Sequence, residues 1–151
     1  MGSFGCDYGM AMQIDFINTV DYFNDKPKLY PSDYTEEVIE NAKDLLFRVN
    51  ALMLELFELH KGEFRFPRIT SGWRPAAYNK SKKGATHSWH ILGRAVDLAD
   101  PDGILAQQIY EVRDLLKLYG LWMERPSKTP GWVHLDTGKR PERDEHIFDP
   151  Y

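Results

Sequence analysis

The sequence contains only one cysteine, Cys6, in 151 residues. One cysteine cannot form an internal disulfide, so folding does not require an oxidising compartment. It also cannot build the cysteine-rich cage that is common in structural zinc sites. A zinc site in this chain would therefore have to use nitrogen and oxygen ligands.

Long apolar runs and dense basic blocks are also absent. The most apolar stretch, residues 45–59, is interrupted by Arg48, Asn50, Glu55 and Glu58, whereas a membrane-spanning helix needs about 18 or more consecutive apolar residues. Nineteen basic and 23 acidic residues give a net charge of -4, and no Lys/Arg block is dense enough to bind a phosphate backbone. We therefore expect neither a membrane nor a nucleic acid as partner.

The first seven residues lack the basic segment and the apolar stretch of a secretory signal. Cys6 also stands where the myristoylation pattern requires Ser or Thr. We expect a protein made in the cytoplasm without a signal peptide. Its 42% hydrophobic and 13% aromatic residues fit one globular domain over residues 1–151, with a substantial core, and we expect this domain to be a monomer.

Apolar periodicity predicts two helices, whereas residues 1–32 show no sustained pattern. Asp33 followed by Glu36 resembles a capping box, and the helix that starts there is predicted to end near Gly62. Asp102 is the predicted cap of a second helix that ends before Gly120. We expect the apolar stripe of each helix to pack on the core. The first stripe consists of Val38, Ala42, Leu45, Val49, Leu52, Leu56 and Leu59, and the second of Leu105, Ile109, Val112, Leu116 and Tyr119.

Short apolar segments predict a sheet. The predicted strands are residues 64–70, an edge strand because of Pro67, and residues 95–98, 121–124 and 132–136. Residues 76–87 and the charged tail 137–151 are predicted to be loops. Helices and strands are segregated along the chain rather than alternating. This order indicates an α+β fold with an antiparallel sheet flanked by helices.

Two histidines and one aspartate form a candidate metal site. His90 and Asp97 lie on opposite sides of a turn at Gly93, and His134 lies in the predicted strand 132–136. If that strand pairs with residues 95–98, side-chain alternation brings His134 and Asp97 to one face, together with Trp132 and Asp136. Catalytic zinc is usually held by three His or Asp/Glu ligands and keeps a fourth position for water.

The residues around this site resemble a known family. Ser88, His90, Gly93, Ala95 and Asp97 match, in spacing and order, the Ser-x-His-x-x-Gly-x-Ala-x-Asp signature of the zinc D-Ala-D-Ala carboxypeptidases and the related phage and bacterial peptidoglycan peptidases. These proteins share a fold with the hedgehog signalling domain. The resemblance implies the hedgehog/DD-peptidase fold, with Zn²⁺ bound by His90, Asp97 and His134.

Two further elements extend the resemblance over roughly residues 69–136. Trp132-Val-His134 is similar to an aromatic residue that closely precedes a His in the family, and Ser71-Gly-Trp-Arg74 is similar to an upstream Ser-Gly-aromatic-Arg element. Arg74 precedes Pro75, which favours an extended backbone, and its planar guanidinium suits a substrate carboxylate or an oxyanion. Substrate contacts are predicted for Arg74, with Ser81 or Asn79 nearby, and for His87, whose other interpretation is an exposed loop histidine.

The general base departs from the family pattern. Many members carry an Asp or Glu three residues before the second His, and here that position is Gly131. Glu124 is the first candidate to replace it, because a Glu precedes a Thr-Pro-x-Trp-x-His element in some phage-type relatives. Asp136 is the second candidate, and its alternative role is to orient the His134 ring.

These observations leave two functional hypotheses. The first is a zinc metallopeptidase that hydrolyses peptidoglycan stem peptides, at D-Ala-D-Ala as a carboxypeptidase or at L-Ala-D-Glu as an endopeptidase. Such a protein would be a phage lysis or virion protein acting on the cell wall, or a cytoplasmic dipeptidase. The second is a non-catalytic, zinc-stabilised binding module of the same fold, which Gly131 favours.

Overall fold

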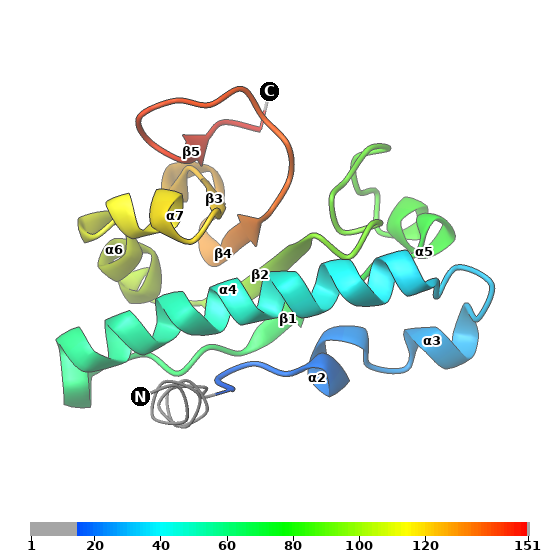
Figure 1. The fold of residues 1–151 in the computed structure, drawn as a ribbon, viewed down its shortest axis with the longest axis horizontal. Coiled ribbons are helices and arrows are strands. Elements are labelled where there is room, and N and C mark those ends of the chain that lie inside the picture. The colour runs from blue at the N-terminus through cyan, green and yellow to red at the C-terminus, as the bar shows by residue number, and fades with distance from the viewer. Residues whose placement is uncertain (1–14, 151) are drawn as a thin grey trace, which may run out of the picture.

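A long helix packed against a five-stranded sheet is the main feature of the protein (Figure 1). The computed structural model describes residues 15–150. The helices are α2 (Thr19–Phe23), α3 (Lys26–Leu29), α4 (Glu36–His60), α5 (Ala76–Ser81), α6 (Ile104–Glu111) and α7 (Asp114–Leu118), with 3-10 turns η1 (Lys61–Glu63) and η2 (Pro126–Lys128). The strands are β1 (Ile69–Ser71), β2 (Ala95–Asp100), β3 (Trp122–Glu124), β4 (Gly131–Asp136) and β5 (Ile147–Phe148).

The strands follow the order β1-β2-β4-β3-β5 across the sheet. All neighbouring pairs are antiparallel except β3 and β5, which are parallel. The α+β class is therefore confirmed, whereas the purely antiparallel sheet is not. The difference comes from β5, which lies in the tail 137–151 that was predicted to be a loop. A strand of two residues is too short to show alternation in the sequence.

Helix α4 begins two residues later than predicted. Thr35, and not Asp33, is its N-cap, because the Thr35 hydroxyl accepts a hydrogen bond of 3.3 Å from the Val38 backbone N–H. The helix ends at His60, and Lys61 follows with a positive φ of 46°. Although α4 has 25 residues, no helix within residues 15–150 is long and apolar enough to cross a membrane.

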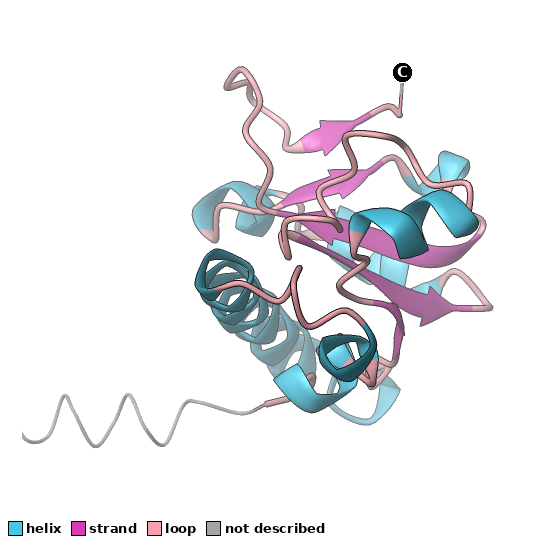
Figure 2. Cartoon of the chain, turned by 90° about the vertical axis from the view of Figure 1, so that its right-hand side faces the viewer, coloured by secondary structure: helices cyan, strands magenta, loops and turns pink. Residues whose placement is uncertain are grey.

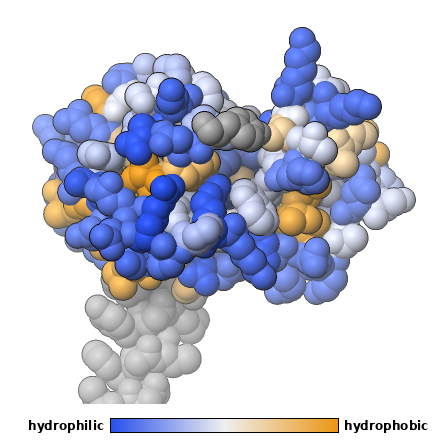
Figure 3. Space-filling view, turned by 90° about the horizontal axis from the view of Figure 1, so that it is seen from above, coloured by the Kyte–Doolittle hydropathy of each residue, from blue (hydrophilic) through white to orange (hydrophobic). Residues whose placement is uncertain are grey.

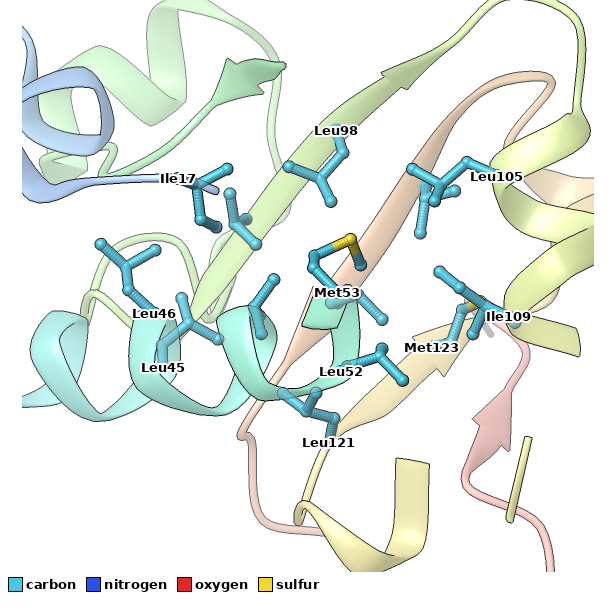
Figure 4. Close-up of a cluster of buried hydrophobic side chains, with 14 of the residues drawn as sticks. Ile17, Leu45, Leu46, Leu52, Met53, Leu98, Leu105, Ile109, Leu121 and Met123 are labelled. Carbon is cyan, nitrogen blue, oxygen red and sulfur yellow. The ribbon is translucent and has the colours of Figure 1, made fainter. Parts of the chain in front are cut away.

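The buried face of α4 forms the centre of the hydrophobic core (Figure 4). Side chains alternate along the strands, so one face of the sheet points towards α4 and α6 and the other carries the polar groups described below. The side chains on the core face are Val96, Leu98, Val133, Leu135 and Met123, all at most 2% exposed. The α4 residues that meet them are the predicted stripe from Val38 to Leu56, together with Leu46 and Met53.

Leu59 was predicted to belong to this stripe, but its side chain is 58% exposed. The last turn of α4 projects past the labelled strands in Figure 1, so the helical period continues where the sheet does not. The prediction for Leu59 is therefore wrong. The spacing of apolar residues predicts which side of a helix faces the core, but it does not predict where the sheet under that helix ends.

A pair of leucine substitutions tests this description of the core. We expect Leu52→Ala, at a fully buried position of α4, to lower the free energy of unfolding by about 2–5 kcal/mol, because the truncation leaves a cavity. Leu59→Ala, seven residues further along the same helix, should change the free energy of unfolding by less than about 0.5 kcal/mol. Urea denaturation of both proteins measures the difference, and equal effects would contradict the assigned helix face.

Three other segments differ from the sequence predictions. The predicted strand 64–70 is a strand only from Ile69 and continues to Ser71 as β1, because Pro67 has no backbone N–H for a strand ladder. Residues 76–81 form α5 rather than loop, and a helix of six residues is too short to show periodicity. The predicted second helix is divided into α6 and α7, because Val112 leaves helical geometry. Its N-cap is Gly103 and not Asp102, while the buried Asp100 carboxylate accepts hydrogen bonds from the first turn of α6.

Candidate metal centre

The sheet brings Asp97 and His134 directly opposite each other. Strand β2 pairs with β4 in an antiparallel register that aligns Asp97 with His134, so the condition on which the candidate site depended is met. His90 joins them from the turn that precedes β2. One ligand atom from each of the three side chains lies within 4.8 Å of the other two. The residues predicted to bind a metal therefore converge on one place, on the face of the sheet away from α4.

The His90 ring is fixed by a backbone carbonyl. Its Nδ1 lies 2.8 Å from the Gly72 carbonyl oxygen, which can only accept, so Nδ1 carries the proton. Nε2 then directs a lone pair towards Asp97, whose Oδ2 is 3.3 Å away. This nitrogen is buried and makes no hydrogen bond. Gly72 itself packs against Tyr22, since a Cβ at position 72 would lie 2.1 Å from the Tyr22 carbonyl oxygen.

The His134 ring is held between two carboxylates. Its Nε2 lies 2.7 Å from Asp136 Oδ2, and its Nδ1 lies 2.9 Å from Asp97 Oδ1. Asp136 is completely buried and accepts further hydrogen bonds from the Gly138 N–H and from the Arg140 guanidinium. Each of the two carboxylate oxygens therefore has two hydrogen-bond partners. This arrangement favours the orienting role for Asp136 over that of a general base.

The electrostatics of the three side chains suit a cation. Burial alone would raise the pKa of Asp97, but the hydrogen bond with His134 holds it well below its usual range. Burial lowers the pKa of His90. Burial also disfavours charge on His134, yet Asp136 and Asp97 raise its pKa to about 9. The site thus attracts positive charge, whether as a proton on His134 or as a metal ion.

The donor set fits zinc. Zinc binds imidazole nitrogen and carboxylate oxygen at about 2.0–2.2 Å, so ligands of one tetrahedral ion lie about 3.4 Å from each other. The two nitrogen to oxygen distances, 2.9 and 3.3 Å, are close to this separation. The buried Nε2 of His90 has no other partner, and a metal ion at this place would provide one.

Glu124 lies beside this cluster on β3. Strand alternation places Glu124 on the same side as Trp122 and opposite the buried Met123. Burial raises the pKa of Glu124, and the charges of His134 and Asp97 also act on it. Its carboxylate therefore shares the electrostatic environment of the cluster without belonging to the ligand set.

Gly131, at the usual place of the acid, begins β4 with a φ of +93°. This is the left-handed region that favours glycine, so a Glu or Asp here would be strained.

The residues predicted to contact substrate do not all lie near the candidate metal site. The Arg74 backbone N–H donates to the His90 carbonyl at 3.1 Å, and its half-buried side chain has an Nε without a hydrogen-bond partner. Asn79 is buried and donates to the Ala85 carbonyl. Ser81 is exposed, with its hydroxyl bonded to the Tyr78 carbonyl, and His87 is exposed in the loop before His90. Arg74 thus lies next to the candidate metal ligands. Within the described residues, no contact links Ser81 or His87 to these ligands.

Two residues of the C-terminal segment reach the site without having been predicted. Arg140 binds Asp136, and the Phe148 ring lies 5.7 Å from the His134 ring in an edge-on orientation. No signal in the sequence indicated Arg140, because a spacing of four residues favours an ion pair only on a helix and this segment was predicted to be a loop. Phe148 gave none either, because its position depends on how the tail folds back along β3.

Comparison with known proteins agrees with these observations. The family model described as Peptidase M15 matches residues 32–136, which is more than half of the chain. No curated protein matches the chain. No solved structure matches it either. The matched region contains His90, Asp97 and His134 and the strands that position them. The chain belongs to the peptidase M15 family of metallopeptidases.

Proposed function

We propose that this protein is a zinc-dependent peptidase that hydrolyses the stem peptides of peptidoglycan, at D-Ala-D-Ala or at L-Ala-D-Glu. The observation that carries the proposal is the convergence of His90, Asp97 and His134, beside the carboxylate of Glu124. Membership of the M15 family supports the peptidase chemistry. The substrate rests on the resemblance of the motif from Ser88 to Asp97 to peptidoglycan peptidases.

Zinc would be held by His90 Nε2, His134 Nδ1 and the Asp97 carboxylate. When bound, zinc lowers the pKa of a coordinated water towards about 7 and polarises a substrate carbonyl. The side chains of His134 and Asp97 are 13% and 16% exposed, so solvent reaches this edge of the cluster. Figure 3 shows a mostly hydrophilic surface on the upper side of the molecule, indented between its larger part and the smaller part at the right.

Glu124 is the proposed general base and acid. As a carboxylate it takes a proton from the attacking water, and as a carboxylic acid it returns that proton to the leaving amine. A raised pKa suits both steps, because the carboxyl group must hold the proton between them. Asp136 keeps His134 in the tautomer that presents Nδ1 to the metal.

Arg74 is the proposed anchor for a substrate carboxylate or for the oxyanion of the tetrahedral intermediate. Its guanidinium is close enough to His90 to influence the pKa of that ring, and its side chain is only partly buried. Ser81 and His87, both exposed, are proposed to contact the stem peptide further from the reacting bond. The protein is proposed to work as a monomer.

Substitution of Arg74 tests this assignment. We expect Arg74→Gln to lower kcat/KM by about 10- to 100-fold, the value of a charge-assisted hydrogen bond, while zinc content stays unchanged. Arg68→Gln, at an exposed arginine that precedes β1, is the charge-matched control and should behave like wild type. If the two variants have the same kcat/KM, Arg74 does not contact the substrate.

Digestion of purified peptidoglycan tests the proposed function as a whole. The zinc-loaded protein should release fragments whose masses identify the broken bond, either free D-Ala or peptides cut after L-Ala. A protein that binds zinc and wall fragments but releases no product would instead be the zinc-stabilised binding module, which Gly131 favours. Comparing intact sacculi with soluble stem peptides distinguishes a phage lysis protein from a cytoplasmic dipeptidase.

A further inference from the structure

The C-terminal segment, residues 137–150, lies outside the region matched by the family but returns to the metal centre. Its beginning is held by a hydrogen bond from the Thr137 N–H to the Arg94 carbonyl. Its end forms β5, the strand nearest to the C-terminus in Figure 2. Strand β5 pairs with β3 in a register that aligns Phe148 with Glu124. Arg125 closes the same edge through an ion pair with Asp149. The segment is thus fixed on both sides of Arg140.

Arg140 makes a two-point contact with the carboxylate behind His134. Its Nη1 lies 2.6 Å from Asp136 Oδ1, and its Nη2 lies 3.0 Å from Oδ2. The Asp136 side chain is 0% exposed and that of Arg140 is 18% exposed. A two-point, charge-assisted contact of this kind fixes the orientation of a carboxylate, and the His134 Nε2 proton bonds to one of the same oxygens.

Aromatic rings fix Arg140 in turn. Its guanidinium carbon lies 3.8 Å from the centre of the Phe148 ring and 5.4 Å from that of Trp122. Phe148 also contacts the His134 ring edge-on. The guanidinium, the carboxylate and the imidazole therefore form one connected group, with Phe148 packed against both of its ends. An exposed arginine that only served solubility would not need these partners.

We infer that Arg140 is a positioning residue of the metal centre, acting through Asp136 to hold the His134 ring with Nδ1 directed at the metal. The inference rests on the proposed metal site and extends it, because it makes the segment beyond residue 136 a part of that site. Without Arg140, His134 is the one cationic partner that the buried Asp136 carboxylate keeps among residues 15–150. The Gly138 N–H still donates to one carboxylate oxygen, but the two-point contact that fixes the plane of the carboxylate is lost. The His134 ring is then held less firmly, and the metal loses a preorganised ligand.

Zinc affinity measures this role without any substrate. We expect Arg140→Gln to bind zinc about 10- to 100-fold more weakly than wild type in competition with a chelator, the usual effect of losing a group that orients a metal ligand. Arg140→Lys keeps the charge but not the two-point contact, so its zinc affinity should lie between that of wild type and that of Arg140→Gln. Arg143→Gln is the matched control, because Arg143 lies in the same segment and beside Trp122 without contacting Asp136. Its affinity should equal that of wild type.

A second measurement separates positioning from general stability. In the zinc-loaded protein, NMR of the imidazole nitrogens should show a protected proton on His134 Nε2, and Arg140→Gln should lose that protection while remaining folded. Wild-type affinity and an unchanged Nε2 proton in Arg140→Gln would overturn the inference but leave the proposed function intact. Failure of the wild-type protein to bind zinc would overturn both.

Discussion

The Glu124→Gln protein is expected to bind zinc as tightly as wild type and to hydrolyse peptidoglycan about 10²- to 10⁴-fold more slowly, the range for loss of a general acid or base. The amide has nearly the shape of the carboxylate but cannot accept a proton at neutral pH. Glu124 lies outside the ligand trio, so the metal should stay in place. Product release, followed by mass spectrometry at full zinc occupancy, measures the rate.

Two comparisons make this result specific. Glu111→Gln removes an equal charge from an exposed position on α6 and should leave the rate unchanged. Asp136→Asn should weaken zinc binding, because Asp136 holds the His134 ring, and extra zinc should restore part of its activity. If Asp136→Asn were inactive at full occupancy while Glu124→Gln remained active, the base would be Asp136.

Replacement of any one metal ligand is expected to have an equally large effect on zinc binding. His90→Ala, Asp97→Ala and His134→Ala each leave two ligands, so bound zinc should be lost at concentrations that saturate wild type. Zinc at about 1,000 times its dissociation constant stabilises a folded protein by about 4 kcal/mol. We therefore expect added zinc to raise the Tm of wild type clearly and to leave that of the three variants nearly unchanged.

His87→Ala is the control for these variants. His87 precedes His90 by three residues but is exposed in the loop, so its removal should leave the zinc-dependent rise in Tm intact. Loss of the rise in His87→Ala, with retention in His90→Ala, would mean that the wrong histidine of this loop has been assigned to the metal.

The parts of the fold that the sequence predicted depend on local periodicity. The spacing of apolar residues placed α4 over residues 36–60 almost correctly. Alternation around Asp97 and His134 predicted that the two side chains share a face if their strands pair, and the structure supplies that pairing between β2 and β4. The wrong predictions concern very short strands and helices, and the place where one element stops packing on another. β5 is only two residues long and forms because β3 offers an edge, and the exposure of Leu59 depends on where the sheet ends.

The candidate site divides in the same way. His90, Asp97 and His134 could be found because metal ligands are side chains of distinctive types at fixed spacing. The groups that orient them could not. His90 is held by the backbone carbonyl of Gly72, and because every residue has such a carbonyl, the sequence does not mark this one. Arg140 reaches Asp136 only because the C-terminal segment folds back. Such contacts are set by the path of the chain and not by a motif.

The most direct test of the account is a crystal structure of the protein soaked in zinc, with anomalous data collected at the zinc edge. The account predicts one strong anomalous peak about 2.0–2.2 Å from His90 Nε2, His134 Nδ1 and an Asp97 oxygen, with Asp136 still bonded to His134 Nε2. A structure without a peak between these three side chains, or with zinc bound elsewhere while they keep their direct contacts, would contradict it.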